Sequence, residues 1–374
     1  MIPGRISPAD IAKGMGLTES EAWKHARNID KHFLPTREQQ CGKKVRIIDA
    51  PKPHMKKLLK KLHRWMHQEN SAHPKAHGGV SRRSPFTSAR RHVSKNRNVW
   101  TRDAKDCFPS INGEMFCREL RQLGFRQDTA KLLTMLCIVR DRIPQGSPVS
   151  NDALNIYLWS LDQTMSSKAG NENCEFTRVA DDLVLSSPCN ESGNKLCREM
   201  EDLLLEKGLK INQKKRKKEG FQNRSKPQHV HSIRVDKRKG TEIHKNHQAV
   251  AWELAERYVS SCKCLQPDSL QATADIRKRL EGYMHYSRQA IYSNVKHLRK
   301  QLELGDRIVA KKLKAIRITA HKGKWWAVSV KRNKFGAKIV TRDEPKRIAA
   351  VWRQRQVEKS KRDRMIQLEL SFVA

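Results

Sequence analysis

Two adjacent carboxylates, Asp181 and Asp182, lie between two short apolar runs rich in Val and Leu. Runs of this length predict two buried strands joined by a tight turn that carries both acids. Buried Asp is rare unless it is paired, hydrogen-bonded or bound to a metal. Because side chains alternate along a strand, only a turn lets Asp181 face a metal while Asp182 supports it from the side. The alternative is a solvated Asp-Asp turn, the usual setting of such a pair.

A third acid, Asp103, follows the short stretch Asn98-Val-Trp-Thr-Arg and precedes Phe108 and Pro109. Proline is favoured in the first turn of a helix, so this segment predicts a strand that ends near Asp103, then a loop and a helix. An acid at such a strand end is well placed to bind a metal. Farther along the chain, Gln145 and Gly146 form a turn in which the glycine allows close approach of the backbone to a ligand.

Lys44 and Arg46 belong to a basic stretch, residues 41–50, that predicts a strand. Two residues apart on a strand, their side chains share one face, and cations at fixed spacing match the oxygens of a triphosphate. An edge strand with protective charges is the alternative. Three carboxylates with flanking cations are what phosphoryl transfer to a nucleic-acid hydroxyl requires, because carboxylates hold two Mg²⁺ ions and cations neutralise the triphosphate.

The elements expected around these residues mix helices and strands. Ser7 and Thr18 predict the caps of two short helices, the second with a capping box completed by Glu21. This pair resembles a helix-turn-helix or, as the alternative, a helical hairpin that docks on the next domain. Apolar spacing predicts further helices over 55–67, over 113–139 with a break near Gly124, over 148–161, over 196–204 ended by Gly208, and over 246–300 with breaks near Pro267 and Gly282. Strands are expected at 209–215, in a hairpin over 229–243 that turns at Lys239 and Gly240, and in a hairpin over 324–340 before a helix over 344–364.

The whole chain is strongly basic. Its 374 residues include 77 Lys and Arg against 39 Asp and Glu, a formal net charge of +38. The excess is spread along the chain and predicts a polyanionic partner, most simply nucleic acid, with an anionic membrane surface as the rival. The mean hydropathy is −0.78 and no run is long and apolar enough for a membrane span, so no membrane insertion is expected.

Cysteine and histidine usage gives no metal or disulfide signature. The N-terminus lacks the apolar core of a signal peptide, and the nine cysteines are scattered, which predicts reduced thiols in a cytoplasmic protein. The fifteen histidines form neither an HExxH nor a CxxC…HxxxH pattern, so the sequence gives no reason to expect metal ligands among them.

Several stretches, taken in order, resemble the motifs of bacterial retron-type and group II intron-type reverse transcriptases. "AHGGV" and "SARRH" resemble the finger region, "DAKDCFPSI" the first catalytic motif, "IPQGSPVSN" the Gln-Gly substrate motif, "RVADDLVLS" the Asp-Asp motif and "LKINQKKRK" the motif that follows it. The resemblance covers residues 40–300. It implies an α+β right-hand polymerase with an N-terminal helical region (1–40), fingers and a palm of antiparallel sheet and helices (41–245), a helical thumb (246–300) and a basic C-terminal extension (301–374).

The resemblance also implies a role for each candidate residue. Asp103 and Asp181 would bind the metal ions, with Asp182 as a supporting acid at the metal site. Phe108 stands where the family has a steric gate against a ribose 2′ hydroxyl. The remaining residues would bind the nucleotide: Gln145 and Gly146 line its pocket, Lys44 and Arg46 hold its triphosphate, and Lys215 lies near it. For these cations, contacts to a nucleic-acid backbone are the alternative.

Three features depart from the family pattern. Val179 replaces the aromatic residue usual before the Asp pair, which removes a ring near the primer end. "VHSIRV", residues 230–235, replaces a Val-Thr-Gly step that is typical of retron enzymes. Residues 301–374 extend beyond a minimal retron enzyme.

The resemblance implies a cytoplasmic RNA-directed DNA polymerase that uses Mg²⁺ and dNTPs to copy a structured RNA, forming an RNA–DNA hybrid, as retron-like antiphage defence systems do. One alternative is an RNA-binding protein on a polymerase fold with weakened chemistry. Another is a truncated intron maturase, although no endonuclease motif accompanies it. The tail segment 367–372, "QLELSF", resembles peptides that bind the bacterial sliding clamp. Burial of these side chains against the C-terminal hairpin is its alternative.

Overall fold

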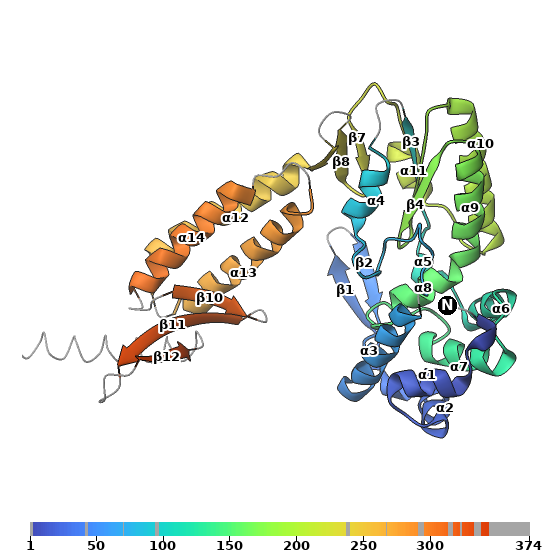
Figure 1. Ribbon diagram of the computed structural model, residues 1–374, viewed down its shortest axis with the longest axis horizontal. Helices are drawn as coiled ribbons and strands as arrows, with labels where there is room; N and C mark the ends of the chain where they lie inside the picture. The colour runs from blue at the N-terminus through green and yellow to red at the C-terminus, as the bar shows by residue number, and fades with distance from the viewer. Residues whose placement is uncertain are drawn as a thin grey trace, which may run out of the picture. The chain divides into compact units, whose positions relative to one another are not determined.

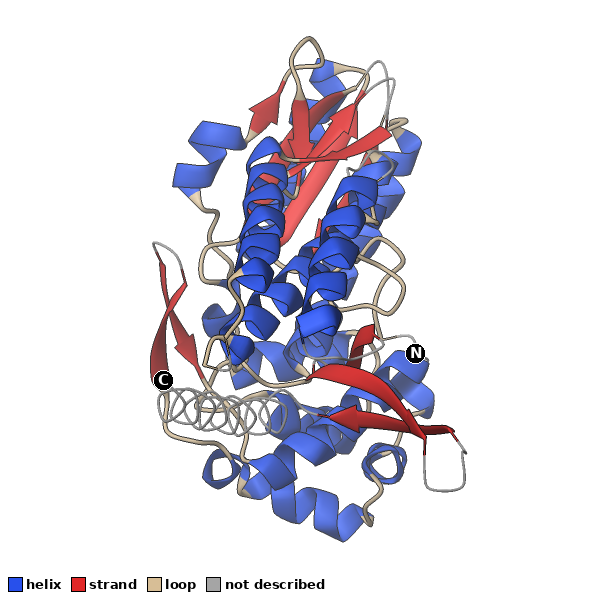
Figure 2. Ribbon diagram, turned by 90° about the vertical axis from the view of Figure 1, so that its left-hand side faces the viewer, coloured by secondary structure: helices blue, strands red, loops and turns tan. Residues whose placement is uncertain are grey.

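The computed structural model describes residues 3–41, 44–69, 71–93, 97–236, 240–266, 268–290, 295–312, 317–321, 324–332 and 338–343. The chain divides into two compact units, Met1–Thr241 and Glu242–Ala374, each of which contains helices and strands (Figure 2). The helix expected over 344–364 and the clamp-like segment 367–372 lie outside the described residues. The prediction of a sliding-clamp partner therefore stays a prediction.

The first unit opens with capped helices. After a short 3-10 turn, η1 (Pro3–Arg5), the predicted caps Ser7 and Thr18 are confirmed at the starts of α1 (Pro8–Met15) and α2 (Glu19–Arg27). The predicted capping box of Thr18 with Glu21 is confirmed, and Ser7 forms one as well, with Asp10. A second 3-10 turn, η2 (Ile29–His32), leads to a two-stranded sheet of β1 (Arg37–Cys41) and β2 (Lys44–Ile48). The helix α3 (Pro53–Gln68) follows and packs along α1, with Met55, Leu59 and Leu62 buried on its apolar face (Figure 1).

A four-stranded antiparallel sheet forms the centre of this unit. Its order is β4 (Glu175–Val179), β5 (Asp182–Ser187), β3 (Asn98–Asp103), β6 (Phe221–Gln222). The helices α9 (Trp159–Asn171) and α10 (Asn190–Glu206) lie side by side against the sheet, while α4 (Pro85–Arg91) contacts β4 (Figure 1). Because strand side chains alternate between faces, Trp100 points to the α10 side, and Thr177 points to α4.

Four short helices connect the strands of this sheet. They are α5 (Cys107–Ser110), α6 (Gly113–Gln122), α7 (Gln127–Cys137) and α8 (Ser150–Tyr157). The break near Gly124, whose φ is 94°, is confirmed. The helix expected over 148–161 instead begins at Ser150 and is interrupted at Leu158, whose backbone angles (φ −95°, ψ 9°) leave the helical region before α9 begins.

The strand predicted at 209–215 is wrong in most of its length. Ile211 forms only an isolated bridge with Ala104, and α11 (Gln213–Glu219) follows directly. The reason is local: the Asn212 side chain accepts a hydrogen bond from the Lys215 backbone N–H and caps the helix. Lys, Arg and Gln then favour helix over strand.

The hairpin expected over 229–243 has a turn that the pattern did not indicate. It consists of β7 (Gln228–Val230), β8 (Ile233–Asp236) and β9 (Gly240–Ile243). His231 and Ser232 form a two-residue turn between β7 and β8, with φ values of 52° and 63°. Positive φ at both positions is the signature of a type I′ turn, which favours Asn and Gly rather than His and Ser.

The second unit is built on α12 (Lys245–Lys263), α13 (Leu270–Ser287) and α14 (Val295–Lys312), which pack together around a core of their own (Figure 1). The break near Pro267 is confirmed, but the one expected at Gly282 is wrong. Gly282 continues α13, because one glycine costs only about 1 kcal/mol and Leu280 and Met284 anchor the helix on both sides. The hairpin expected over 324–340 is confirmed as β11 (Lys324–Arg332) and β12 (Lys338–Asp343), with β10 (Arg317–His321) added. None of the described helices has the length and apolar character to cross a membrane.

Candidate active site

Strand register brings three acids from distant parts of the sequence together. Asp103 ends β3 and pairs with Asp182, the first residue of β5. Asp182 also pairs with Val179 of β4, so Ala180 and Asp181 form the tip of the β4–β5 hairpin. Ala180 has a positive φ of 54°, which turns the chain there. The Ala104 backbone N–H donates to the Asp181 carbonyl at 3.1 Å and fixes the tip against the end of β3.

The carboxylates are only partly neutralised by the chain's own cations. Lys215 Nζ lies 2.7 Å from Asp103 Oδ1, and Asn212 Nδ2 donates to Asp103 Oδ2 at 2.9 Å. Burial, and then the charge of Asp103, raises the pKa of Asp181. Burial lowers the pKa of Lys215, but Asp182 and Asp103 outweigh it and raise that pKa overall, so the ammonium is charged. One lysine against three carboxylates leaves negative charge that a bound cation would relieve.

The donor set fits a hard divalent cation, since carboxylate oxygens are the ligands that Mg²⁺ and Ca²⁺ prefer. Lys215 and Asn212 already contact both oxygens of Asp103. Among the residues that the structure describes, the clusters with ligand atoms all within 4.8 Å of one another do not include this trio. A shared ion would therefore require the three carboxylates to draw closer and Lys215 to yield its position on Asp103.

The carboxylate of Asp182 is hydrogen-bonded to His231, a residue that the sequence analysis did not identify. His231 Nδ1 lies 2.8 Å from Asp182 Oδ2, and the His231 side chain is only 6% exposed. From there a continuous series of hydrogen bonds of 2.7–2.9 Å crosses the sheet. In order, it joins Asp182, His231, Ser88, Thr177, His92 and Ser186.

The direction of this series follows from its ends. An ionised Asp182 can only accept, so His231 donates through Nδ1 and its Nε2 accepts from the Ser88 hydroxyl. Thr177 then donates to Ser88, and His92 donates to Thr177 through Nε2. Burial, with the charge of His231 next, holds the pKa of His92 well below its usual value, which suits this neutral, donor-and-acceptor role. The Ser88 and Thr177 hydroxyls thus each have one donor and one acceptor partner, and the Ser186 hydroxyl donates to His92 Nδ1 at the end of the series.

Arg178 holds the hairpin tip from inside. Its fully buried guanidinium donates to Asp162 Oδ1 and Oδ2 at 2.8 and 2.6 Å and to the Ala180 carbonyl at 2.8 Å. The backbone of Arg178 is bound on both sides, since its N–H donates to the Lys75 carbonyl at 2.9 Å and its carbonyl accepts from the His77 N–H at 2.6 Å. The tip is therefore fixed by a buried ion pair and by a neighbouring extended segment.

Gly78, in that neighbouring segment, makes the closest approach to the tip. A Cβ at this position would lie 2.3 Å from the Ala180 backbone nitrogen, a contact that no side chain can make. Asn155 Nδ2 donates to the Gly78 carbonyl at 2.9 Å and holds it in place. The "AHGGV" stretch therefore packs on the acid-bearing turn.

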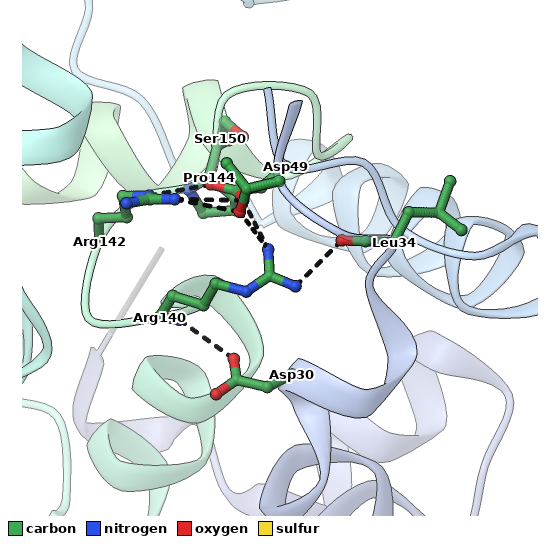
Figure 3. A network of polar contacts seen from close by, with 8 residues as sticks. Asp30, Leu34, Asp49, Arg140, Arg142, Pro144 and Ser150 are labelled. Carbon is green, nitrogen blue, oxygen red and sulfur yellow. Dashed lines mark hydrogen bonds and ion pairs between the residues drawn. The ribbon is translucent and has the colours of Figure 1, made fainter. Parts of the chain in front are cut away.

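The Gln145–Gly146 turn rests on the end of β2. Gly146 has a φ of 121°, and a Cβ there would lie 3.2 Å from the Asp49 carbonyl oxygen. The Asp49 N–H donates to the Gln145 carbonyl at 2.8 Å. The Asp49 side chain is in turn held by Arg140 at 2.6 Å and Arg142 at 2.9 Å (Figure 3).

This network is a rigid support rather than an open phosphate site. Burial raises the pKa of Asp49, but hydrogen bonds from Arg142, Thr36 and Arg140 outweigh it and leave the pKa below its usual value. Arg140 also donates to the Leu34 carbonyl at 3.0 Å (Figure 3). Both arginines are thus committed to Asp49 and fix β2 to the Gln145 turn.

The structure places the other candidate residues as follows. Arg46 is exposed on β2, and the side chain of Lys44 lies outside the described residues. Phe108 is half-buried on α5 and packs against the main core. Asp103, Asp181, Asp182 and Lys215 meet at one place, and Gln145 and Gly146 meet the strand that carries Arg46. In the described part of the chain, no hydrogen bond joins this second group to the acids.

Part of this chain is similar to known proteins. Residues 36–234, more than half of the chain, match the family described as "Reverse transcriptase (RNA-dependent DNA polymerase)". The retron Ec86 reverse transcriptase of Escherichia coli is 28% identical over 173 residues, which cover 46% of this chain and 54% of that protein. The retron Mx162 reverse transcriptase of Myxococcus xanthus is 31% identical over 199 residues, 47% of this chain and 41% of that protein. The chain spans about half the length of the curated relatives it matches.

A solved telomerase structure from Candida albicans has a TM-score of 0.42 and 11% identity, covering 80% of this chain and 68% of that one.

Proposed function

The chain belongs to the reverse transcriptase family, and from this premise we propose that it is a retron-type RNA-directed DNA polymerase with its active site at Asp103, Asp181 and Asp182. The observation that carries the proposal is the pairing of β3 with β5, which sets Asp103 opposite Asp182 beside the Asp181 turn. The raised pKa of Asp181, caused by burial and then by Asp103, supports a site that awaits a cation.

Two Mg²⁺ ions fit this donor set better than softer metals, because all the donors are carboxylates. When bound, such ions would activate a primer 3′ hydroxyl and stabilise the leaving pyrophosphate. Asp103 and Asp181 would hold them, while Asp182, oriented by His231, supports the site. Lys215, released from Asp103, would then face the triphosphate of the incoming nucleotide.

The nucleotide would lie between the acids and the β1–β2 hairpin. Gln145 and Gly146 would contact its base and sugar, since Gly146 offers a backbone without a side chain. Lys44 and Arg46 would bind the triphosphate oxygens. Phe108, five residues after Asp103 at the start of α5, would exclude a ribose 2′ hydroxyl and so select dNTPs.

The template would be a structured RNA, with the RNA–DNA hybrid held by α12–α14 as a thumb. The net charge of +38 supports a polyanion of this size. The named relatives are retron reverse transcriptases, which supports a retron-like system. We extend the proposal to a role in antiphage defence in the cytoplasm.

The test is primer extension by the Asp181→Asn variant on a primed RNA template with dNTPs and Mg²⁺. Loss of a metal ligand should slow DNA synthesis by more than about a hundredfold. RNA affinity should change little, because phosphate contacts are made elsewhere. Asp202→Asn is the matched control, since Asp202 is exposed on α10. Wild-type synthesis by Asp181→Asn would end the assignment.

Two observations favour a second candidate, an RNA-binding protein with weakened chemistry. Lys215 and Asn212 contact both oxygens of Asp103, and Val179 stands where the family has an aromatic residue. The same assay separates the two functions. Tight RNA binding by the wild type without any extension of several primers would favour this second candidate.

A further inference from the structure

Three histidines gather where the N-terminal helices meet α3. His25 lies in the last turns of α2, His32 ends η2, and His54 lies in the first turn of α3. The Lys52 N–H donates to the His32 carbonyl at 2.8 Å, which holds the end of η2 beside the start of α3. Their separations along the chain match no metal-binding pattern, so the sequence alone gave no sign of this cluster.

The ring nitrogens have a spacing that suits metal ligands. His25 Nδ1 lies 3.3 Å from His32 Nε2, and His32 Nδ1 lies 3.1 Å from His54 Nε2. One nitrogen from each ring can be chosen so that all three lie within 4.8 Å of one another. On a tetrahedral Zn²⁺ with Zn–N bonds of about 2.0–2.1 Å, two ligand atoms lie about 3.3 Å apart.

The three rings need only a small change in position to bind one ion together. His32 uses both of its ring nitrogens for the two short contacts, and only one of them can bind the ion. One contact must therefore open while the third ligand closes in. His54 is exposed, so a change of rotamer there supplies this movement without disturbing the core.

The neutral imidazole is the form of histidine that binds metals, and protonation competes with the metal. Both ring nitrogens of His32 face other imidazoles, and a neutral ring can use one nitrogen as donor and the other as acceptor in these two contacts.

A second cluster shows the contrast. His63 Nδ1 and His67 Nε2 lie 2.7 and 3.1 Å from the two oxygens of Asp152, whose side chain is 2% exposed. A buried carboxylate needs such donors, so these contacts are explained without an ion. In the three-histidine cluster, the partner in each short contact is another imidazole and not a buried carboxylate that needs donors.

We propose that His25, His32 and His54 form a binding site for a late first-row transition metal ion, of which Zn²⁺ is the best match. Imidazole nitrogens suit this class of metal, whereas Mg²⁺ prefers oxygen. The ion ties α2 and η2 to α3, and a water completes its coordination. The Leu34 N–H donates to the Ala50 carbonyl at 2.9 Å next to the site, so the ion also braces the base of the β1–β2 hairpin.

The test uses the full-length chain without a histidine tag, stripped by a chelator and titrated with Zn²⁺ against a chromophoric chelator. Excess Mg²⁺ occupies the carboxylate site and leaves the imidazoles available. His32→Ala and His54→Ala should weaken one Zn²⁺ equivalent by more than about tenfold, since even indirect support of a ligand is worth about 10–100-fold. When Co²⁺ replaces Zn²⁺, the visible absorption of four-coordinate Co²⁺ should appear in the wild type and be lost in the same two variants.

His63→Ala is the matched control, because His63 lies in α3, as His54 does, but belongs to the cluster around Asp152. This variant should still bind the equivalent of Zn²⁺ that His32→Ala loses. His54 is exposed, so its substitution reports on binding even if His32→Ala misfolds. Equal Zn²⁺ affinity and stoichiometry in the wild type and His54→Ala, or no Zn²⁺ bound by the wild type, would overturn the proposal. Neither result depends on polymerase activity.

Discussion

Phe108 is half-buried, with its ring packed against the core on one side. A wall of this kind selects by space, because a bulkier sugar must displace a ring that the core supports. Phe108→Ala should therefore raise the ratio of rNTP to dNTP incorporation, measured as kcat/KM for single additions on a primed RNA. Phe221→Ala, at an exposed phenylalanine on β6, serves as control. An unchanged ratio in Phe108→Ala would remove the gate role.

His231 contacts the carboxylate of Asp182 directly, so its loss should act through that carboxylate. A hydrogen bond to a charged group contributes about 1.5–3 kcal/mol, so His231→Ala should lower kcat by about tenfold or more with little change in RNA affinity. His231→Gln keeps a side-chain N–H and should recover part of kcat. Equal loss in both variants, with a parallel fall in stability, would indicate a purely structural role.

At the scale of elements, the β4–β5 tip depends on the segment that packs beside it. Gly78→Ala places a Cβ 2.3 Å from the Ala180 backbone nitrogen, so the tip must shift and Asp181 with it. Overpacking of this kind costs about 1–3 kcal/mol, and primer extension should fall together with the free energy of unfolding in urea.

Gly170→Ala provides the matched control for this change. Gly170 lies in α9, and a Cβ there meets nothing within 4 Å. Alanine favours the helix, so this variant should gain about 0.5–1 kcal/mol and keep full activity. Similar behaviour of the two alanine variants would contradict the close contact at Gly78.

Local patterns were enough to predict a tight turn between two strands around Asp181 and Asp182, because apolar runs lie on both sides of the acids. They placed both acids on the turn, whereas the structure has the turn at Ala180 and Asp181 and makes Asp182 the first residue of β5. They could not predict that Asp103 pairs with Asp182, since register between distant strands depends on the folded sheet. The same limit hid His231, which meets Asp182 across 49 positions of sequence. The sequence grouped Asp103 with the other two acids only through the metal chemistry that three carboxylates could share, and the family resemblance supported that grouping.

The wrong elements have local causes of a different kind. Leu209 and Ile211 alternate like a strand, but the cap at Asn212 starts a helix two residues later. Gly282 suggested a break, yet buried Leu280 and Met284 hold α13 together. In α13, burial of neighbouring side chains outweighs the low helix propensity of one glycine. At α11, a helix cap outweighs a short alternation of apolar and polar residues.

At the scale of the whole molecule, the dominant feature is charge. A formal net charge of +38 is spread over both units, including the lysines of α11, which lies next to the carboxylate cluster. Such a field attracts nucleic acid of any sequence. The RNA phosphates hold condensed counterions, and the protein's cations release them on binding. Affinity for RNA should therefore depend on salt as strongly as on sequence.

RNA affinity, measured by fluorescence anisotropy between about 50 and 200 mM salt, should fall linearly on a log–log plot, with a slope of about −0.7 for each phosphate contacted on a single strand. If Arg46 binds a phosphate, Arg46→Gln should make this log–log slope shallower by about 0.7, the value of one contact. This measurement is made with a primed template and dNTP present. Arg118→Gln changes the same charge at an exposed arginine that is paired with Glu114, and it should leave the slope as it is. A flat titration of the wild type would show that contacts other than phosphates dominate the interface.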